Sequence, residues 1–204
     1  MRAIIYAGAT RYDVAMIWRY LIEGPWLVFV VYWSIGALKT RRTVQTETSA
    51  SRYGILLLEV LGFVLLFSTA WHVELAPLGR AVLPESYALA ISGVVLTWIG
   101  IAIALWARWH LGQNWSARIT LKEDHELIRT GPYRFFRHPI YSGIDLAAIG
   151  GALAINRWRC VLGVILIIAG YWIKAKREER MLANQFGPAF EEHCRKTGFL
   201  LPKF

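Results

Sequence analysis

The chain has 204 residues, 56% of them apolar and only 18% charged, and its net charge at neutral pH is +9. Soluble domains usually carry about 25% charged residues, so these numbers exclude a disordered chain and disfavour a soluble globule. The two cysteines, Cys160 and Cys194, cannot form a disulfide framework and do not stand in a metal-binding spacing with histidine. The composition points to a membrane protein whose basic surplus needs an explanation.

Three apolar segments in the first half of the chain are long enough to cross a bilayer as helices. The clearest, residues 87–107, contains no charged residue, and about 20 apolar residues at roughly 1.5 Å each span the hydrocarbon core. Residues 54–73 contain one charge, Glu59, and residues 16–38 are also predominantly apolar. Residues 1–107 are therefore expected to hold the N-terminal transmembrane helices.

Two shorter apolar runs follow in the second half, at residues 140–155 and 160–173. A short polar turn separates them, which predicts an antiparallel helical hairpin. Gly143, Ala147 and Gly151 recur every fourth residue and give the first of these helices a small face for close packing. With the three longer segments, the hairpin predicts an all-α polytopic membrane protein with about five transmembrane helices.

Five spans divide the positive charge unequally between the two sides of the membrane. Residues 39–52, residues 108–137 and the tail after residue 173 share one side and carry 17 Lys and Arg residues, against six on the other side. Because cytoplasmic segments are enriched in Lys and Arg, we expect the N-terminus outside and the C-terminus in the cytoplasm of an integral membrane protein. The sequence does not tell which membrane this is.

The same distribution explains the basic surplus without nucleic acid. Orientation in the bilayer and attraction to anionic lipid account for it, so the bilayer is the expected partner and nucleic acid is not. Aromatic residues near the span ends suit an aromatic belt. They are Trp18, Tyr20, Trp71, Trp106, Trp109, Trp158, Tyr171 and Trp172.

The longest polar stretch, residues 108–139, is too long for a minimal connection between two helices. It contains a Gly-Pro turn at residues 130–133 and then Arg137-His138-Pro139, directly before an apolar helix. Pro139 suits the first turn of that helix, where a missing N–H is tolerated. Arg137 and His138 are therefore expected at its cytoplasmic N-terminus, a position that favours anionic groups.

Four carboxylates lie at or just beyond the expected cytoplasmic ends of the spans. Glu178 and Glu179 stand between cations in the segment 174–204, which continues the last helix out of the bilayer. They fit solvated surface charges, or carboxylates that bind hydroxyls or a cationic group of a cofactor. Glu59 and Asp145 lie near the ends of their spans, and because ionisable groups at membrane depth are costly, both are candidates for lining a substrate cavity.

The second half of the chain also carries an ordered set of motifs. They are Leu111-Gly112-Gln113-Asn114-Trp115-Ser116, His125-Glu126-Leu127, Gly131-Pro132-Tyr133, Arg137-His138-Pro139, Tyr141, Glu178-Glu179, Leu182, Phe186-Gly187 and Pro202. In their order and spacing, residues 108–204 resemble the isoprenylcysteine carboxyl methyltransferase family and the related phospholipid N-methyltransferases. Residues 1–86 match only as apolar spans.

The resemblance implies an integral membrane methyltransferase that uses S-adenosylmethionine. The acceptor would be a lipidic or small hydrophobic molecule that presents a carboxylate, amine or thiol at the cytoplasmic face. The catalytic region would be residues 108–204, made of the loop 108–139, the helical hairpin 140–173 and the cofactor-binding segment 174–204. The cofactor-pocket candidates carried over are His125, Leu127, Gly131, Tyr133, His138, Pro139, Tyr141, Glu178 and Glu179.

Four further residues are expected near the reacting groups: Asn114, Trp115, Arg137 and Lys174. The Arg137 guanidinium suits the planar methionine carboxylate. Asn114 and Trp115 are placed to contact the acceptor head group, although an interface anchor explains Trp115 equally well. Lys174 stands where carboxyl methyltransferases of the family carry arginine. Since lysine lacks the bidentate fork of arginine, this departure weakens the case for a prenylcysteine carboxylate.

Methyl transfer from a sulfonium is a direct displacement that depends on alignment and exclusion of water, so no metal site is expected. An amine or thiol acceptor needs proton removal, for which His110, His138 or a glutamate of the pair are candidates. The alternative enzyme is an NADPH-dependent membrane reductase of the sterol or steroid type, whose tail resembles this one less well. A scaffold or transporter subunit would leave the long polar loop without a purpose. The acceptor and the oligomeric state stay open.

Overall fold

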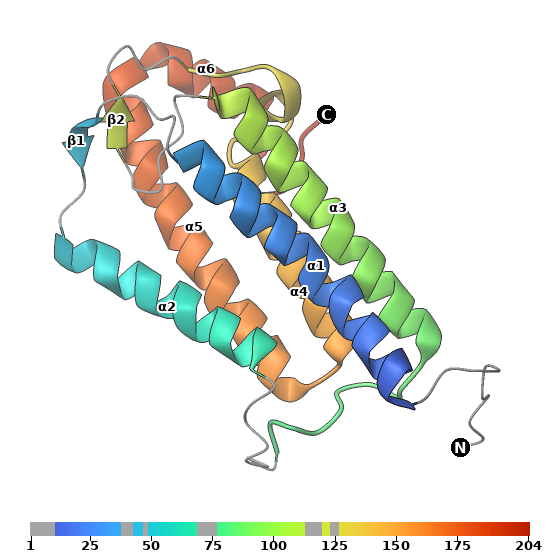
Figure 1. The fold of residues 1–204 in the computed structure, drawn as a ribbon. Coiled ribbons are helices and arrows are strands. Elements are labelled where there is room, and N and C mark those ends of the chain that lie inside the picture. The colour runs from blue at the N-terminus through green and yellow to red at the C-terminus, as the bar shows by residue number, and fades with distance from the viewer. Residues whose placement is uncertain (1–10, 38–42, 47–48, 69–76, 113–119, 123–126) are drawn as a thin grey trace.

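The computed structural model describes residues 11–37, 43–46, 49–68, 77–112, 120–122 and 127–204. Within these residues the chain is predominantly helical (Figure 1). The helices are α1 (Arg11–Ala37), α2 (Ser49–Phe67), α3 (Tyr87–Leu111), α4 (Pro139–Ile155), α5 (Trp158–Phe186) and α6 (Pro188–Lys196), with one short 3-10 helix, η2 (Gly131–Arg134). Two short strands, β1 (Thr43–Thr46) and β2 (Thr120–Lys122), pair in antiparallel fashion.

Two of these helices, α3 and α5, are long and apolar enough to cross a membrane, and two shorter apolar helices cover Tyr53–Phe67 and Pro139–Ile155. Their outward faces carry large apolar side chains such as Trp98, Ile99 and Ile165, which are about half exposed. Exposed apolar surface on this scale marks an interaction site rather than a water-facing surface. The helices therefore have the membrane character that the composition indicated, while the expected count of five spans goes beyond these findings.

Helices α3 and α4 pack at backbone contact through small residues on both sides. A Cβ atom on Gly100 would overlap backbone atoms of Gly143 and Ala147, and one on Gly150 would overlap the backbone of α3. Of the predicted small-residue repeat, Gly143 and Ala147 lie in this α3–α4 contact, whereas a Cβ atom added at Gly151 would lie 3.8 Å from Leu66 of α2. At 3.6 residues per turn, a step of seven residues returns closer to the starting face than a step of eight.

Helix α2 packs against both α5 and α1. A Cβ on Gly62 would meet the Gly163 carbonyl oxygen of α5 at 2.7 Å, so this crossing is also close. Trp26 of α1 packs edge-to-face on Phe63 and Phe67 of α2, with ring centroids 5.3 and 5.5 Å apart. Trp26 and its neighbours belong to the apolar core that extends through α3, α4 and α5.

The polar site lies where α4 begins and where α5 leaves its apolar part. The apolar run of α5 ends near residue 173, but the helix continues without a break to Phe186. Helix α6 and the last residues of the chain then fold back over the start of α4 (Figure 1). The residues carried by α4, α5 and this C-terminal segment therefore meet at one end of the bundle.

Candidate active site

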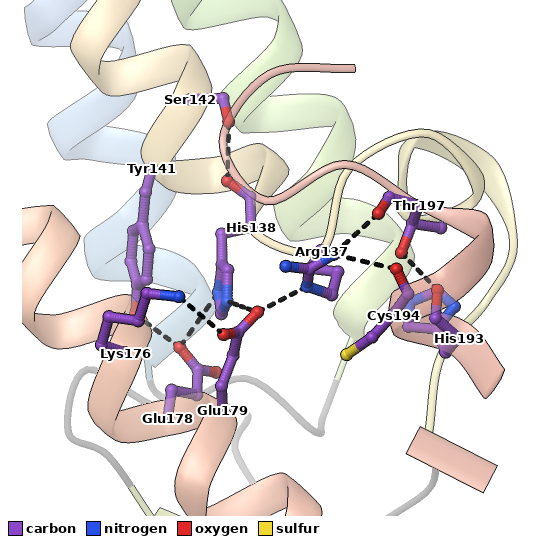
Figure 2. Close-up of polar contacts among 10 residues, drawn as sticks. All are labelled: Arg137, His138, Tyr141, Ser142, Lys176, Glu178, Glu179, His193, Cys194 and Thr197. Carbon is purple, nitrogen blue, oxygen red and sulfur yellow. Dashed lines mark hydrogen bonds and ion pairs between the residues drawn. The ribbon is translucent and has the colours of Figure 1, made fainter. Parts of the chain in front are cut away.

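His138 lies between the two adjacent glutamates of α5 (Figure 2). Its Nδ1 atom is 3.6 Å from Glu178 Oε2, and its Nε2 atom is 3.6 Å from Glu179 Oε1. Successive residues on a helix point about 100° apart, which lets neighbouring carboxylates reach opposite sides of one imidazole. The Tyr141 hydroxyl donates a hydrogen bond of 2.9 Å to Glu178 Oε2. Four residues separated by up to 41 positions thus form one connected centre.

Arg137 holds this centre to the C-terminal segment (Figure 2). Its Nε atom donates to Glu179 Oε1 at 2.5 Å, and its Nη1 atom donates to the carbonyl oxygens of Thr197 at 2.7 Å and Cys194 at 3.3 Å. The Lys176 ammonium lies 3.5 Å from the other carboxylate oxygen of Glu179. In this geometry the guanidinium binds protein groups, so its expected role toward the methionine carboxylate stays a prediction.

The last residues of the chain cover His138. The Ser142 hydroxyl donates to the Leu200 carbonyl oxygen at 2.6 Å, and the Gly198 amide donates to the Phe135 carbonyl oxygen at 2.9 Å. The Phe199 ring packs edge-on against the imidazole at 5.3 Å. As a result, only 3% of the His138 side chain is exposed. None of these covering residues carries a motif on its own, so sequence reasoning did not find them.

The remaining predicted site residues lie in different surroundings. Tyr133 is buried beside the centre, and burial together with the Glu178 charge raises the pKa of its hydroxyl. Pro139 is buried in the first turn of α4, as its position before an apolar helix predicted. Gly131 has a φ of +58° and packs against the His110 ring, where a Cβ would overlap the ring. Leu127 is partly exposed. His125 lies outside the described residues, as do Asn114 and Trp115, which were predicted near the reacting groups.

Lys174 forms an ion pair with Glu59 of α2, and its charge also acts on Glu178 of the His138 centre. Its Nζ atom is 3.5 Å from Glu59 Oε1 and lies over the rings of Tyr141 and Tyr171. The prediction of Tyr171 as a membrane-interface anchor is wrong, because the residue is only 8% exposed and its ring stacks on Tyr141 at 5.0 Å. The i, i+3 spacing of Tyr171 and Lys174 puts both on one face of α5, a signal that could have suggested a buried role.

The electrostatics of the centre favour a charged imidazole between charged carboxylates. Burial alone opposes protonation of His138, but hydrogen bonding and charge interaction with Glu178 and Glu179 outweigh it and raise the His138 pKa. Burial likewise disfavours the charged form of Glu179, yet His138 and Arg137 outweigh that effect and lower its pKa to about 2. The pKa of Glu178 is also lowered, against burial, by His138 and Tyr141.

These opposite shifts predict that stability depends on pH with a maximum in the mildly acidic range. The His138 contribution is complete below its ordinary pKa of 6.5 and is lost as pH rises through the raised pKa of the folded state. The glutamate contributions are complete above about pH 4.5 and are lost as pH falls through the lowered values, which for Glu179 is about 2. Unfolding in detergent should therefore show greatest stability between about pH 4.5 and 6.5. His138→Gln should remove the decline on the alkaline side, and an unchanged decline would contradict the assignment to His138.

The fold and the centre together define a helical protein of membrane character with a buried acidic and histidine site at the end of its last long helix. The model of the isoprenylcysteine carboxyl methyltransferase (ICMT) family matches residues 93–184, just under half of the chain. This stretch runs from α3 into α5 and includes Arg137, His138, Tyr141 and the glutamate pair. The match confirms, for that stretch, the family resemblance predicted from the motifs.

Three relatives illustrate the similarity. A "Probable protein-S-isoprenylcysteine O-methyltransferase" of Oryza sativa subsp. indica is 33% identical over 86 residues, 42% of this chain and 45% of that protein. The "Protein-S-isoprenylcysteine O-methyltransferase" of Schizosaccharomyces pombe is 28% identical over 94 residues, 45% of this chain and 40% of the relative. The "Cobalt-zinc-cadmium resistance protein CzcN" of Cupriavidus metallidurans is 31% identical over 96 residues, 46% and 44% respectively. The chain thus spans less than half the length of these relatives.

Proposed function

We propose that the protein is an integral membrane methyltransferase that transfers the methyl group of S-adenosylmethionine to a lipidic or small hydrophobic acceptor at the cytoplasmic membrane face. The observation that carries this proposal is the connected centre of Tyr141, His138, Glu178 and Glu179 inside the family-matched stretch. The names of two relatives, which are isoprenylcysteine O-methyltransferases, support methyl transfer. They give no support to the reductase alternative.

The residues of the centre fit the proposed cofactor. The His138 Nε2 atom is buried, and its ion-pair partner Glu179 Oε1 lies 3.6 Å away. About a third of the Glu178 side chain is exposed, against 15% for Glu179. Glu178 is therefore the carboxylate more open to the hydroxyl or amino groups of a nucleoside, while Glu179 is engaged by Arg137 and Lys176. We assign Glu178 and Tyr141 to cofactor binding and Arg137 to positioning.

The chemistry then divides between the cofactor and the protein. When bound, S-adenosylmethionine supplies an electrophilic methyl group on sulfur and a neutral thioether as leaving group. The protein orients the reactants and excludes water. The C-terminal segment covers His138, and Arg137 joins that segment to Glu179. Alignment of this kind accounts for much of the rate enhancement when two reactants are brought together. Asn114, Trp115 and His125 remain proposed contributors from the connecting loop.

The proposed membrane arrangement follows the sequence. Five spans within residues 1–107 and 140–173 place the N-terminus outside, and the catalytic region 108–204 contributes its polar loop and C-terminal segment to the cytoplasmic face. The unequal distribution of Lys and Arg supports this orientation. Accessibility of single introduced cysteines to an impermeant thiol reagent, in intact cells and in inverted vesicles, tests it.

Cofactor binding provides the direct test of the proposed function. Isothermal titration of the purified full chain in detergent should show binding of S-adenosylhomocysteine and none of NADPH. Glu178→Gln should weaken this binding about tenfold, or about 1.4 kcal/mol, because the amide cannot replace a charged acceptor. Glu192→Gln makes the same chemical change on the exposed face of α6 and should leave binding unchanged. Binding of NADPH in place of S-adenosylhomocysteine would refute the methyltransferase.

A further inference from the structure

A second polar cluster lies about one helical turn from His138, further into the apolar part of the bundle. We call it the deep cluster. Its members come from α2, α4 and α5, and they are Glu59, Tyr141, Asp145, Tyr171 and Lys174. The Lys174 ammonium is 3.5 Å from Glu59 Oε1 and 5.6 and 5.5 Å from the ring centroids of the two tyrosines. Tyr141 belongs to both groups, because its hydroxyl donates to Glu178. The deep cluster is thus continuous with the proposed cofactor site.

Asp145 is the member of the deep cluster whose hydrogen-bonding capacity is unfilled. It follows Tyr141 by four residues, so both lie on one face of α4. The residue is 7% exposed, and its Oδ1 atom is buried without a hydrogen-bond partner among the described residues. Electrostatic interactions connect it to Glu59 and Tyr171. A buried carboxyl group without a donor costs about 1–3 kcal/mol or more, and such groups at membrane depth usually mark a functional site.

The charges of the deep cluster favour a cation as the missing partner. Glu59 offsets the Lys174 ammonium, so an ionised Asp145 adds a surplus negative charge, whereas Glu178, one turn from Lys174 on α5, is paired with His138. A carboxylate ligand would approach the Asp145 carboxylate and a lysine that is already paired with Glu59. An ammonium group would instead meet an open carboxylate, and the faces of Tyr141 and Tyr171 attract cations further.

We infer that the deep cluster is the acceptor site and that it binds the amine head group of a long-chain or lipidic amine, with Asp145 as its ion-pair partner. This inference rests on the proposed methyltransferase function and narrows its acceptor from a carboxylate, amine or thiol to an amine. The apolar helix faces around the cluster suit the hydrocarbon part of such a molecule, because large apolar side chains are exposed along α2 and α5.

The proton balance gives Asp145 a second task. An amine bound as ammonium has no free electron pair, so one proton must leave its nitrogen, and the Asp145 carboxylate accepts it. The nitrogen electron pair then forms the new N–C bond. The bond from the methyl carbon to the donor sulfur breaks, and the electron pair of this broken bond stays on sulfur. The methylated nitrogen carries the positive charge that the sulfonium loses.

Binding without the methyl donor tests the inference. Dodecylamine, dodecanoate and dodecanol have the same chain length, and each is titrated into the purified full chain in a neutral detergent near neutral pH. Dodecanol measures how strongly the hydrocarbon chain partitions without a charged head group. We expect dodecylamine to bind at least about tenfold more tightly than the other two. Asp145→Asn should remove that preference, whereas Glu192→Gln on α6 should keep it.

Lys174→Gln should change the affinity for dodecylamine in the direction opposite to Asp145→Asn. Loss of the lysine removes one positive charge from the deep cluster, so dodecylamine should bind at least about threefold more tightly than to the original chain. This variant carries the test if Asp145→Asn does not fold, as judged by thermal unfolding. Tightest binding of dodecanoate, equal binding of the amine and the alcohol, or weaker amine binding by Lys174→Gln overturns the inference.

S-adenosylhomocysteine titration of the same samples separates the two proposals. If S-adenosylhomocysteine binds and dodecylamine shows no preference, the amine site is wrong and the methyltransferase stands. If dodecylamine binds with the expected variant pattern and S-adenosylhomocysteine does not bind, the proposed reaction is wrong and the amine site stands on its own.

Discussion

Glu179→Ala is expected to lower the free energy of unfolding by about 3–5 kcal/mol, because removal of one partner leaves buried charges uncompensated. Glu179 contacts Arg137, His138 and Lys176, and the side chains of the Arg137–Glu179 pair are only 14% and 15% exposed. In a chain of this size, that change corresponds to a fall in melting temperature of roughly 10 °C. Thermal unfolding in a fixed detergent provides the measurement.

A double variant shows whether the loss comes from the ion pair itself. Arg137→Met with Glu179→Met removes both charges together, so it should cost less than the sum of the two single replacements. Additive costs would mean that Arg137 and Glu179 act independently, contrary to their 2.5 Å contact. Glu192→Ala on the exposed face of α6 serves as the control and should leave the melting temperature nearly unchanged.

Gly100→Ala is expected to destabilise the protein by about 3 kcal/mol, the upper part of the usual range for overpacking. The added methyl group would overlap backbone atoms of Gly143 and Ala147. A backbone cannot move aside as a flexible side chain can, so α3 and α4 would have to separate. Since α4 begins directly after His138, we also expect S-adenosylhomocysteine binding to weaken in this variant.

Gly54→Ala makes the matched comparison on α2. Nothing lies within 4 Å of a Cβ atom added at Gly54, which is exposed in the helix. Alanine should therefore stabilise that helix by about 0.5–1 kcal/mol. The two variants should shift the melting temperature in opposite directions. An equal or higher melting temperature for Gly100→Ala would show that the α3–α4 contact is looser than described.

The sequence predicted the membership of the His138 centre better than its contacts. Spacing along the chain placed His138 at the start of one helix and Glu178 and Glu179 beyond the apolar part of another, and the structure brings them together with Tyr141. The partners of Arg137 could not be predicted in this way. Two of them are backbone carbonyl groups of the C-terminal segment, and every residue type carries a carbonyl.

The contacts between helices could not be predicted from the sequence either. The pairing of Lys174 with Glu59 joins residues 115 positions apart, and it depends on how far α2 and α5 are rotated about their axes. The apolar parts of α2 and α5 carry apolar residues on all sides, so they lack the separate polar and apolar faces that indicate how a helix is rotated. The same lack of a distinct face explains why Tyr171 was predicted at the membrane interface and why the small-residue face of α4 was predicted to include Gly151.

The unbroken course of α5 has a consequence for the choice of acceptor. Lys174 of the deep cluster and Glu178 of the proposed cofactor site are four residues apart on one helix, which is a rise of about 6 Å. A continuous helix does not stretch, so the backbone of α5 fixes the distance along the helix between the proposed cofactor site and the deep cluster. On the function proposed here, the enzyme selects by depth: an amine whose nitrogen lies too shallow or too deep in the bilayer is not methylated, however well its chain is bound.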